Sequence, residues 1–306
     1  MRFSTVVPLA LAAAPAVVSA GGLGGTLGFA LGDKKTDGSC KAQSDYEADL
    51  EAIGDVATMG VIRTYAAHEC DQAKLLIPAC KAKGFKVLLG MWPDTEESFQ
   101  LDFTALKNNV PGNEDYVYGI TVGSEALYRG DLTGEELLTY INKVQAEFPS
   151  LLIGTADSWN KYTDGSADAL IEGGVELFLA NGFSYWQGQA IDNATATYFD
   201  DMMQALGYIQ NKKGSTSGFT FMTGETGWPT TGGTDYGSAI ASTANAKTFF
   251  KEGVCGMLDW GVDVFYFEAF DEPWKPASTG DNGESEDETH WGAYTSARVA
   301  KFDLTC

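Results

Sequence analysis

The feature that most constrains the fold is a regular alternation between short apolar, β-branched segments and segments with helical periodicity, which runs through the chain from Leu23 onward. Each strand-like segment is followed by a helical pattern or by a long loop. Such alternation is typical of α/β proteins with a parallel sheet. The eight predicted strands are residues 24–31, 61–66, 86–91, 117–124, 151–157, 177–185, 219–225 and 263–270.

The helical segments carry start and stop signals. In residues 133–148 the apolar side chains recur at the spacing of one helix face. Thr133 and Glu136 have the spacing of a capping box, which indicates that a helix begins there. Gly84 and Pro149 follow two predicted helices, where residues of these types end a helix.

Eight strand–helix units are the number found in a (β/α)8 TIM barrel, an α/β fold. The alternative is an open, doubly wound sheet, which would place a glycine-rich phosphate loop after its first strand. In this chain the glycine-rich residues 21–25 precede the first strand instead. No Pro/Ser-rich linker or change of composition divides the chain. The sequence therefore predicts a single TIM barrel over residues 21–306.

Residues 1–20 have the features of a signal peptide. Arg2 supplies a positive start, residues 6–18 are apolar, and the stretch ends at Ala20 in a small-x-small pattern. The apolar run is too short to span a membrane, and a buried N-terminal helix is the alternative. We expect an exported protein that acts outside the cell as a monomer.

The chain is strongly acidic, with a formal net charge of −22 at pH 7. An acidic surface repels phosphate backbones and anionic lipids, so neither nucleic acid nor membrane is expected as a partner. A neutral polysaccharide is compatible with such a surface. With only two histidines and no CxxC motif, the chain offers little for a zinc site or a histidine-based triad.

The chain has five cysteines, and export favours disulfides. An odd number leaves at least one cysteine without an intramolecular partner. A bond between Cys70 and Cys80 is not expected, because both fall on one predicted helix about 15 Å apart. The pairing otherwise stays open. The cysteines are Cys40, Cys70, Cys80, Cys255 and Cys306.

Aromatic residues gather just past the predicted strand ends, which is where a TIM barrel carries its active site. Five of the seven tryptophans occupy such positions, and flat aromatic faces at a rim can stack on sugar rings. The alternative is that these rings fill the barrel mouth. Trp260 closes a predicted helix and is expected in the core. The five are Trp92, Trp159, Trp186, Trp228 and Trp274.

Two glutamates end apolar strands. Glu125 and Glu225 close predicted strands four and seven, and small residues precede both. A carboxylate at such a position costs free energy unless it is partnered or used. A salt-bridged rim residue would explain one of them. Two such glutamates, with tryptophans nearby, favour the interpretation that they are a catalytic pair.

Three segments resemble glycoside hydrolase family 17: residues 122–129 (VGSEALYR), 224–230 (GETGWPT) and 267–275 (FEAFDEPWK). They are most similar to its fungal cell-wall branch of glucan endo-1,3-β-glucosidases and β-1,3-glucanosyltransferases. The resemblance covers the whole predicted mature chain. It implies that β-1,3-glucan is the donor and the acceptor, that Glu125 is the acid/base, and that Glu225 is the nucleophile.

The resemblance also implies that Tyr65, Glu272 and Lys275 line the same cleft, with Tyr65 and Lys275 able to steady the charge on Glu225. Many relatives have Asn where this chain has Ser124, so we expect Ser124 to hold the sugar 2-hydroxyl more weakly. Further substrate-binding candidates come from the strand ends. They are Trp92, Trp159, Asn181, Tyr185, Trp186, Trp228 and Trp274.

A retaining glycosidase needs two carboxyl groups roughly 5–5.5 Å apart, one as nucleophile and one as acid and then base. This cycle requires no metal and no organic cofactor. Three functions remain open: an endo-hydrolase, a transferase with the same glutamates, and a non-catalytic wall-binding protein. Another β-glycan is the alternative substrate.

Three weaker signals have plain structural readings. Asn193 begins a glycosylation sequon and is expected on an exposed loop. Residues 281–288 are acidic but lack calcium-ligand spacing, so they predict a solvated rim loop. His68 follows the second strand and is expected at the rim without a role.

Overall fold

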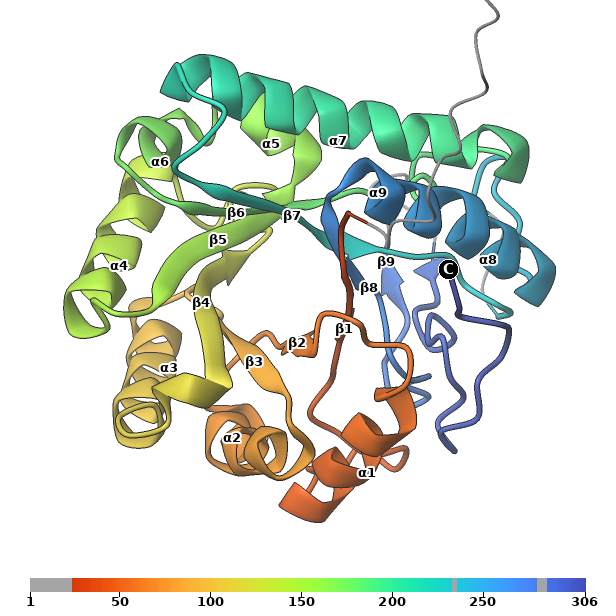
Figure 1. Ribbon diagram of the computed structural model, residues 1–306, viewed down its shortest axis with the longest axis horizontal. Coiled ribbons are helices and arrows are strands. Elements are labelled where there is room, and N and C mark those ends of the chain that lie inside the picture. The colour runs from red at the N-terminus through yellow and green to blue at the C-terminus, as the bar shows by residue number, and fades with distance from the viewer. Residues whose placement is uncertain (1–23, 233–235, 280–284) are drawn as a thin grey trace, which may run out of the picture.

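The computed structural model describes residues 24–232, 236–279 and 285–306 (Figure 1). The predicted signal peptide, residues 1–20, lies outside the described residues. Eight parallel strands pair in chain order, and β8 pairs with β1 to close the barrel, which confirms the predicted TIM fold. The strands are β1 Leu27–Ala30, β2 Val61–Arg63, β3 Lys86–Met91, β4 Val117–Ser124, β5 Leu152–Ser158, β6 Leu177–Asn181, β7 Thr220–Thr226 and β8 Asp263–Tyr266.

Helices surround the barrel, and the longest of those described, α7, runs along one side of it (Figure 1). The α-helices are α1 Gln43–Ile53, α2 Gln72–Lys83, α3 Glu96–Asn109, α4 Gly134–Glu147, α5 Trp159–Thr163, α6 Asp168–Glu172, α7 Ile191–Lys213, α8 Thr243–Phe249 and α9 Cys255–Trp260. Shorter helical turns are η1 Glu69–Asp71, η2 Glu114–Tyr116 and η3 Phe250–Val254, and a hairpin pairs β9 Ser278–Thr279 with β10 Ser285–Glu286. None of the helices in the described ranges combines the length and apolarity needed to cross a membrane.

Alternating strand residues build two apolar layers. Val87 and Leu89 of β3 join the large core between the strands and the helices. Leu88, between them, joins a separate buried cluster. That second cluster consists of strand residues only, as expected where side chains of period two point into the barrel. Its members are Val61, Leu88, Ala156, Leu177, Leu179, Met222 and Phe265.

Local signals located the helix ends well, whereas three strands end earlier than predicted. The Thr133 hydroxyl accepts from the Glu136 amide, and the Glu136 carboxylate accepts from the Thr133 amide, as the capping box requires. By contrast β2, β6 and β8 end at Arg63, Asn181 and Tyr266. The apolar residues beyond these ends belong to the loops that follow the strands, so apolarity alone did not mark the end of pairing.

Two disulfides fasten the chain. Cys40 pairs with Cys70 and Cys255 pairs with Cys306, while Cys80 is buried and unpaired. The absence of a Cys70–Cys80 bond is confirmed, although the stated reason was wrong. Cys70 lies in η1 with a φ of 50°, outside α2. This positive φ takes Cys70 off the helix and leaves it free to pair with the loop after β1.

Two predictions about individual positions are wrong. Trp260 is 43% exposed, because it is the last residue of α9 and the chain turns away at Gly261, which has a φ of 95°. Asn193 lies in the first turn of α7 and not on a loop. Its amide donates to Gln189 and Thr197 while the residue stays exposed.

Candidate active site

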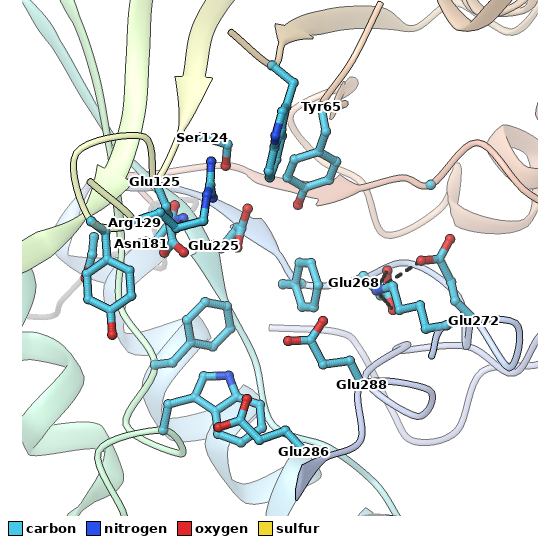
Figure 2. Close-up of a pocket in the computed structure, with 18 of the residues that line it drawn as sticks. Tyr65, Ser124, Glu125, Arg129, Asn181, Glu225, Glu268, Glu272, Glu286 and Glu288 are labelled. Atoms are coloured by element: carbon cyan, nitrogen blue, oxygen red, sulfur yellow. Dashed lines mark hydrogen bonds and ion pairs between the residues drawn. The ribbon is translucent and has the colours of Figure 1, made fainter. Parts of the chain in front are cut away.

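A cleft of about 810 Å³ opens at the C-terminal ends of the strands, and every strand of the barrel or the loop after it contributes to its lining (Figure 2). This volume is typical of a ligand-binding site. Both glutamates predicted as catalytic line it.

The end of β4 holds Glu125 in an unusual backbone conformation. Gly123 has a φ of 85° and Glu125 a φ of 57°. A non-glycine residue in this region is disfavoured, and such conformations concentrate at functional sites. The Glu125 amide donates to the carbonyl of Ala156, which ties the turn to β5. The backbone therefore turns the Glu125 carboxyl out of the ladder and into the cleft.

A buried arginine holds Glu225. The Arg63 guanidinium is fully buried, and its Nη1 donates to Glu225 Oε1 and to the Gly224 carbonyl, each at 2.8 Å. Its Nη2 donates to Ser124 Oγ at 2.9 Å. A Cβ on Gly224 would lie 2.5 Å from Asn181 Oδ1, so glycine makes room for this arrangement.

Arg63, and not Lys275, supplies the positive charge beside Glu225, so the charge-steadying role expected for Lys275 is wrong. Sequence reasoning placed Arg63 at the end of a strand but gave it no function. A signal was present, because an arginine inside an apolar strand is almost never buried without a charged partner.

Asn181 connects the two glutamates. Its Nδ2 donates to Glu125 Oε1 at 3.0 Å, and its Oδ1 lies 3.5 Å from Arg63 Nη1. It lies directly opposite Glu225 in the pairing of β6 with β7. The Asn181 amide and the Arg63 guanidinium thus hold Glu125 and Glu225 in one hydrogen-bonded network.

The two glutamates have different electrostatic environments. Burial raises the pKa of Glu125 to about 7, and the negative charge of nearby Glu225 acts in the same direction. Glu225 instead contacts the permanent positive charge of Arg63. Near neutral pH, Glu125 is therefore suited to donate a proton, and Glu225 has a counter-charge for its carboxylate.

Tyr65 lies over the guanidinium of Arg63, with 5.0 Å between the guanidinium carbon and the ring centroid. Burial raises the pKa of its phenol well above the usual value, and the charge of Glu225 adds to this effect. Tyr65 lines the cleft, with its buried hydroxyl beside Glu225. It is positioned to meet a ligand beside Glu225.

Lys275 is bound by two other carboxyl groups. Its Nζ lies 3.0 Å from both oxygens of Glu268 and 3.0 Å from Glu272 Oε2. Burial raises the pKa of Glu268 well above its ordinary value, as does the neighbouring charge of Glu272. Glu272 and Lys275 line the cleft as the resemblance implied. Glu268 lines it too and was missed, although it stands in an apolar strand end where a carboxyl is a signal.

The acidic stretch 281–288 is not simply a solvated rim loop. Glu286 and Glu288 line the cleft, and Figure 2 shows the Glu288 carboxyl directed into it. Burial raises the pKa of Glu288. Residues 281–284 lie outside the described residues.

The predicted aromatic set divides in two. Trp92, Trp159, Trp186 and Trp274 line the cleft. Trp228 is fully buried and its indole N–H donates to the Ile240 carbonyl, so the sugar-stacking role predicted for it is wrong.

Tyr185 is also buried, at 2% exposure, and does not line the cleft. Its ring lies 5.0 Å, centroid to centroid, from both Trp186 and Trp228. Tyr185 thus contacts Trp186 directly, and the ring of Trp186 also lies 5.2 Å from that of the buried Trp291.

Comparisons with known proteins agree with this geometry. Residues 28–292 match the family model of the BtgE/BtgC glycoside hydrolase domain. The chain is 59% identical to a glucan 1,3-beta-glucosidase of Arthroderma benhamiae, covering 100% of this chain and 98% of the relative. It is 43% identical to a glucan 1,3-beta-glucosidase of Saccharomyces cerevisiae, covering 100% and 99%.

Among solved structures, the chain is similar to a glycoside hydrolase family 17 beta-1,3-glucanosyltransferase from Rhizomucor miehei. The TM-score is 0.78 at 29% identity, covering 91% of this chain and 97% of that one. An active-site mutant of the Rhizomucor miehei transferase in complex with laminaritriose also gives a TM-score of 0.78, at 28% identity, covering 92% and 98%.

Proposed function

The chain belongs to the BtgE/BtgC glycoside hydrolase family, and from this premise we propose that it is a retaining glycosidase that acts on β-1,3-glucan. The printed activities of its relatives, glucan 1,3-beta-glucosidase and beta-1,3-glucanosyltransferase, support this substrate. We further propose that another glucan chain competes with water as the acceptor.

The observation that carries the proposal is the pair of glutamates with opposite electrostatic environments in one cleft. Glu125 has a pKa raised to about 7 by burial and by Glu225. Glu225 is hydrogen-bonded to Arg63. One group can give a proton while the other attacks, and this division of roles is what double displacement needs.

In the first step, Glu225 attacks the anomeric carbon as Glu125 protonates the departing glycosidic oxygen. The glucan breaks and a glycosyl ester forms on Glu225. The ester has no negative charge, so the repulsion that raises the pKa of Glu125 is removed. Glu125 then accepts a proton from the incoming hydroxyl, which attacks the ester with overall retention.

The choice between water and sugar as acceptor depends on how well the cleft holds a second chain. Trp159, the first residue of α5, and Trp186, on the loop after β6, line it and offer aromatic surface for an acceptor. A positioned acceptor reaches the glycosyl ester at a high effective concentration. Transfer should therefore dominate when oligosaccharide is abundant.

We also propose that residues 1–20 are a signal peptide and that residues 21–306 form the mature catalytic domain. The basic start, the apolar run and the small residues before position 21 support this. We propose that it acts as a monomer outside the cell or in the cell wall, a location that export and a polymeric substrate support.

The nucleophile is tested by covalent trapping. A 2-fluoro-glucosyl reagent with a good leaving group should label Glu225 and no other residue. Glu225→Gln should lose turnover and still bind laminari-oligosaccharides, because hydrogen bonds to the amide and the rest of the cleft remain. Label on another residue, or a Glu225→Gln variant with near-normal turnover, would refute the assignment.

Transfer is tested with laminaripentaose at millimolar concentration. Products longer than the substrate should appear at early times, and their share should rise with concentration. If only shorter sugars form at every concentration, the protein is a hydrolase without transfer. If no oligosaccharide is consumed, the substrate proposal itself fails.

A further inference from the structure

Arg129 is an accessible cation in the cleft that the mechanism above does not use. It lies on the loop after β4, lines the cleft, and its side chain is 34% exposed. Its guanidinium lies over the indole of Trp92, 4.2 Å from the ring centroid. Its Nε donates to Asp131 Oδ2 at 2.9 Å.

These contacts fix the plane of the guanidinium and leave donors free. Neither Nη1 nor Nη2 of Arg129 has a hydrogen-bond partner among the described residues. An arginine held flat in this way is a preformed fork of N–H donors, and it loses little side-chain entropy when a ligand binds. A fork of donors suits adjacent hydroxyl groups of a sugar ring.

The Trp92 side of this pair is anchored as well. The Trp92 amide donates to Asp102 Oδ2 at 2.8 Å. Asp102 is fully buried, and its other oxygen accepts from the His68 amide and from His68 Nδ1. This gives His68 a supporting contact where sequence analysis assigned none. These contacts hold the Trp92 backbone in place, and its indole lies against the guanidinium.

The position of Arg129 relative to the glutamates assigns it to one end of the cleft. The Arg129 amide donates to the Glu125 carbonyl at 2.9 Å. In Figure 2, Glu125, Arg129 and Asn181 lie on one side of Glu225, with Glu268 and Glu272 on the other. An acid that protonates the leaving oxygen must lie on the leaving-group side, so Arg129 borders the space of the leaving sugar and, later, of the acceptor.

We propose that Arg129 binds the glucosyl residue on the acceptor side of the scissile bond, with its Nη groups donating to hydroxyls and its plane extending the surface of Trp92. This inference rests on the proposed function and adds a specificity-determining residue to it. The ligand is a neutral β-linked glucosyl unit. Arg129 therefore influences how often the glycosyl ester is taken by sugar and how often by water.

The charge of Arg129 has a separate effect that the test must isolate. Burial, Glu225 and Asp157 raise the pKa of Glu125, whereas the hydrogen bond from Asn181 and the charge of Arg129 lower it. Arg129→Lys keeps the charge and loses the planar fork. Arg129→Gln loses both. A sugar-binding role therefore predicts that even the lysine variant is impaired.

The experiment uses 2,4-dinitrophenyl β-laminaribioside as donor and laminaribiose as a varied acceptor. The donor's leaving group needs no acid. The rate of transfer to laminaribiose therefore measures how well the acceptor side of the cleft binds the incoming sugar. In Arg129→Lys the laminaribiose concentration for half-maximal transfer should rise about tenfold. A rise of this size corresponds to the loss of one hydrogen bond from a charged donor. The alkaline limb of the pH profile on glucan should stay in place, and in Arg129→Gln it should move to higher pH.

The matched control is Arg298→Lys. Arg298 also donates through Nε to an aspartate, Asp49, and does not line the cleft. The Arg298→Lys variant should need the same laminaribiose concentration for half-maximal transfer as the wild type. Thermal unfolding of each variant shows whether the fold is intact, and a folded Arg129→Lys with unchanged acceptor dependence overturns the inference.

An equal loss of transfer and of acceptor-free hydrolysis in Arg129→Lys also overturns it, because that pattern means general damage to the site. Both outcomes require a wild-type protein that acts on glucan. A wild type inactive on glucan would instead refute the proposed function, so the two failures are distinguishable.

Discussion

At the scale of single residues, the chemistry depends on how buried charges are paired. Arg63 is fully buried and donates to Glu225, Gly224 and Ser124. A buried arginine without a carboxylate would be strongly destabilising. Pairing with Glu225 meets that requirement and also holds the nucleophile candidate in place.

The environment of Glu125 predicts a specific pH dependence. Its pKa is raised to about 7 by burial and by Glu225, and the proposed first step requires its protonated form. The kcat/KM for glucan should therefore be retained below pH 7 and decline as pH rises through 7. The pH profile of glucan cleavage measures this directly.

A substrate with a dinitrophenyl leaving group serves as the control. Its first step needs no proton from Glu125, so pre-steady-state release of the phenol should show no decline near pH 7. The assignment of Glu125 as the acid is contradicted if both substrates lose rate at the same pH.

At the scale of elements, loops after the strands carry the site while packed rings support them. The loop after β6 bends sharply, since the Gly188 amide donates to the Tyr185 carbonyl and the Gln189 amide to the Ser184 carbonyl. In this turn the Tyr185 ring packs edge to face against Trp186. Neighbouring aromatic residues on one loop therefore have different functions.

Trp186 and Trp228 should consequently respond in opposite ways to substitution by alanine. Trp228→Ala should lower the free energy of unfolding by about 3–5 kcal/mol, because it removes a fully buried ring. Trp186→Ala should chiefly weaken binding of long oligosaccharides, by about 0.5–1.5 kcal/mol for a lost stacking contact. Chemical denaturation and KM as a function of chain length separate the two effects.

Trp260→Ala is the matched control, since this ring is 43% exposed on α9 and does not line the cleft. The Trp260→Ala substitution should change neither the free energy of unfolding nor the binding of long oligosaccharides much. Loss of oligosaccharide affinity in a Trp228→Ala protein of unchanged stability would contradict the assignment of Trp228 to the core.

At the scale of the whole molecule, the barrel closes by pairing β1 with β8, and a disulfide fastens the C-terminal segment. Cys255 at the start of α9 pairs with Cys306, the last residue, across a sequence separation of 51. Phe302 and Leu304 in the same segment are buried. Covalent and apolar contacts thus hold the end of the chain on the barrel.

Breaking this disulfide should destabilise the protein without changing its chemistry. The chain-entropy model gives a loss of about 4 kcal/mol for a loop of this length. Cys306→Ser should therefore lower the midpoint of denaturant unfolding while kcat on glucan at low temperature is retained. Cys40→Ser, which opens a separation of 30, should give a slightly smaller loss.

An unchanged midpoint in Cys306→Ser would mean that Phe302 and Leu304 hold the segment by packing alone. A loss of kcat with an unchanged midpoint would instead place the C-terminal segment in the catalytic machinery.

The sequence by itself determined the repeating architecture and the position of the two glutamates at strand ends. Both are local signals: alternation of period two and of 3.6 follows directly from backbone geometry, and a glutamate after small residues at an apolar strand end is visible without neighbours. The capping box at Thr133 was predictable for the same reason.

Only the tertiary structure decided which side chains meet. Arg63 contacts Glu225 across 162 positions of sequence, Lys275 turns to Glu268 and Glu272, and the depth of a tryptophan past a strand end depends on loops that fold over it. Trp228 and Trp186 occupy equivalent positions in the sequence pattern, yet Trp228 is enclosed and Trp186 lines the cleft. Burial and charge pairing are sums over distant contacts, and a linear pattern does not contain them.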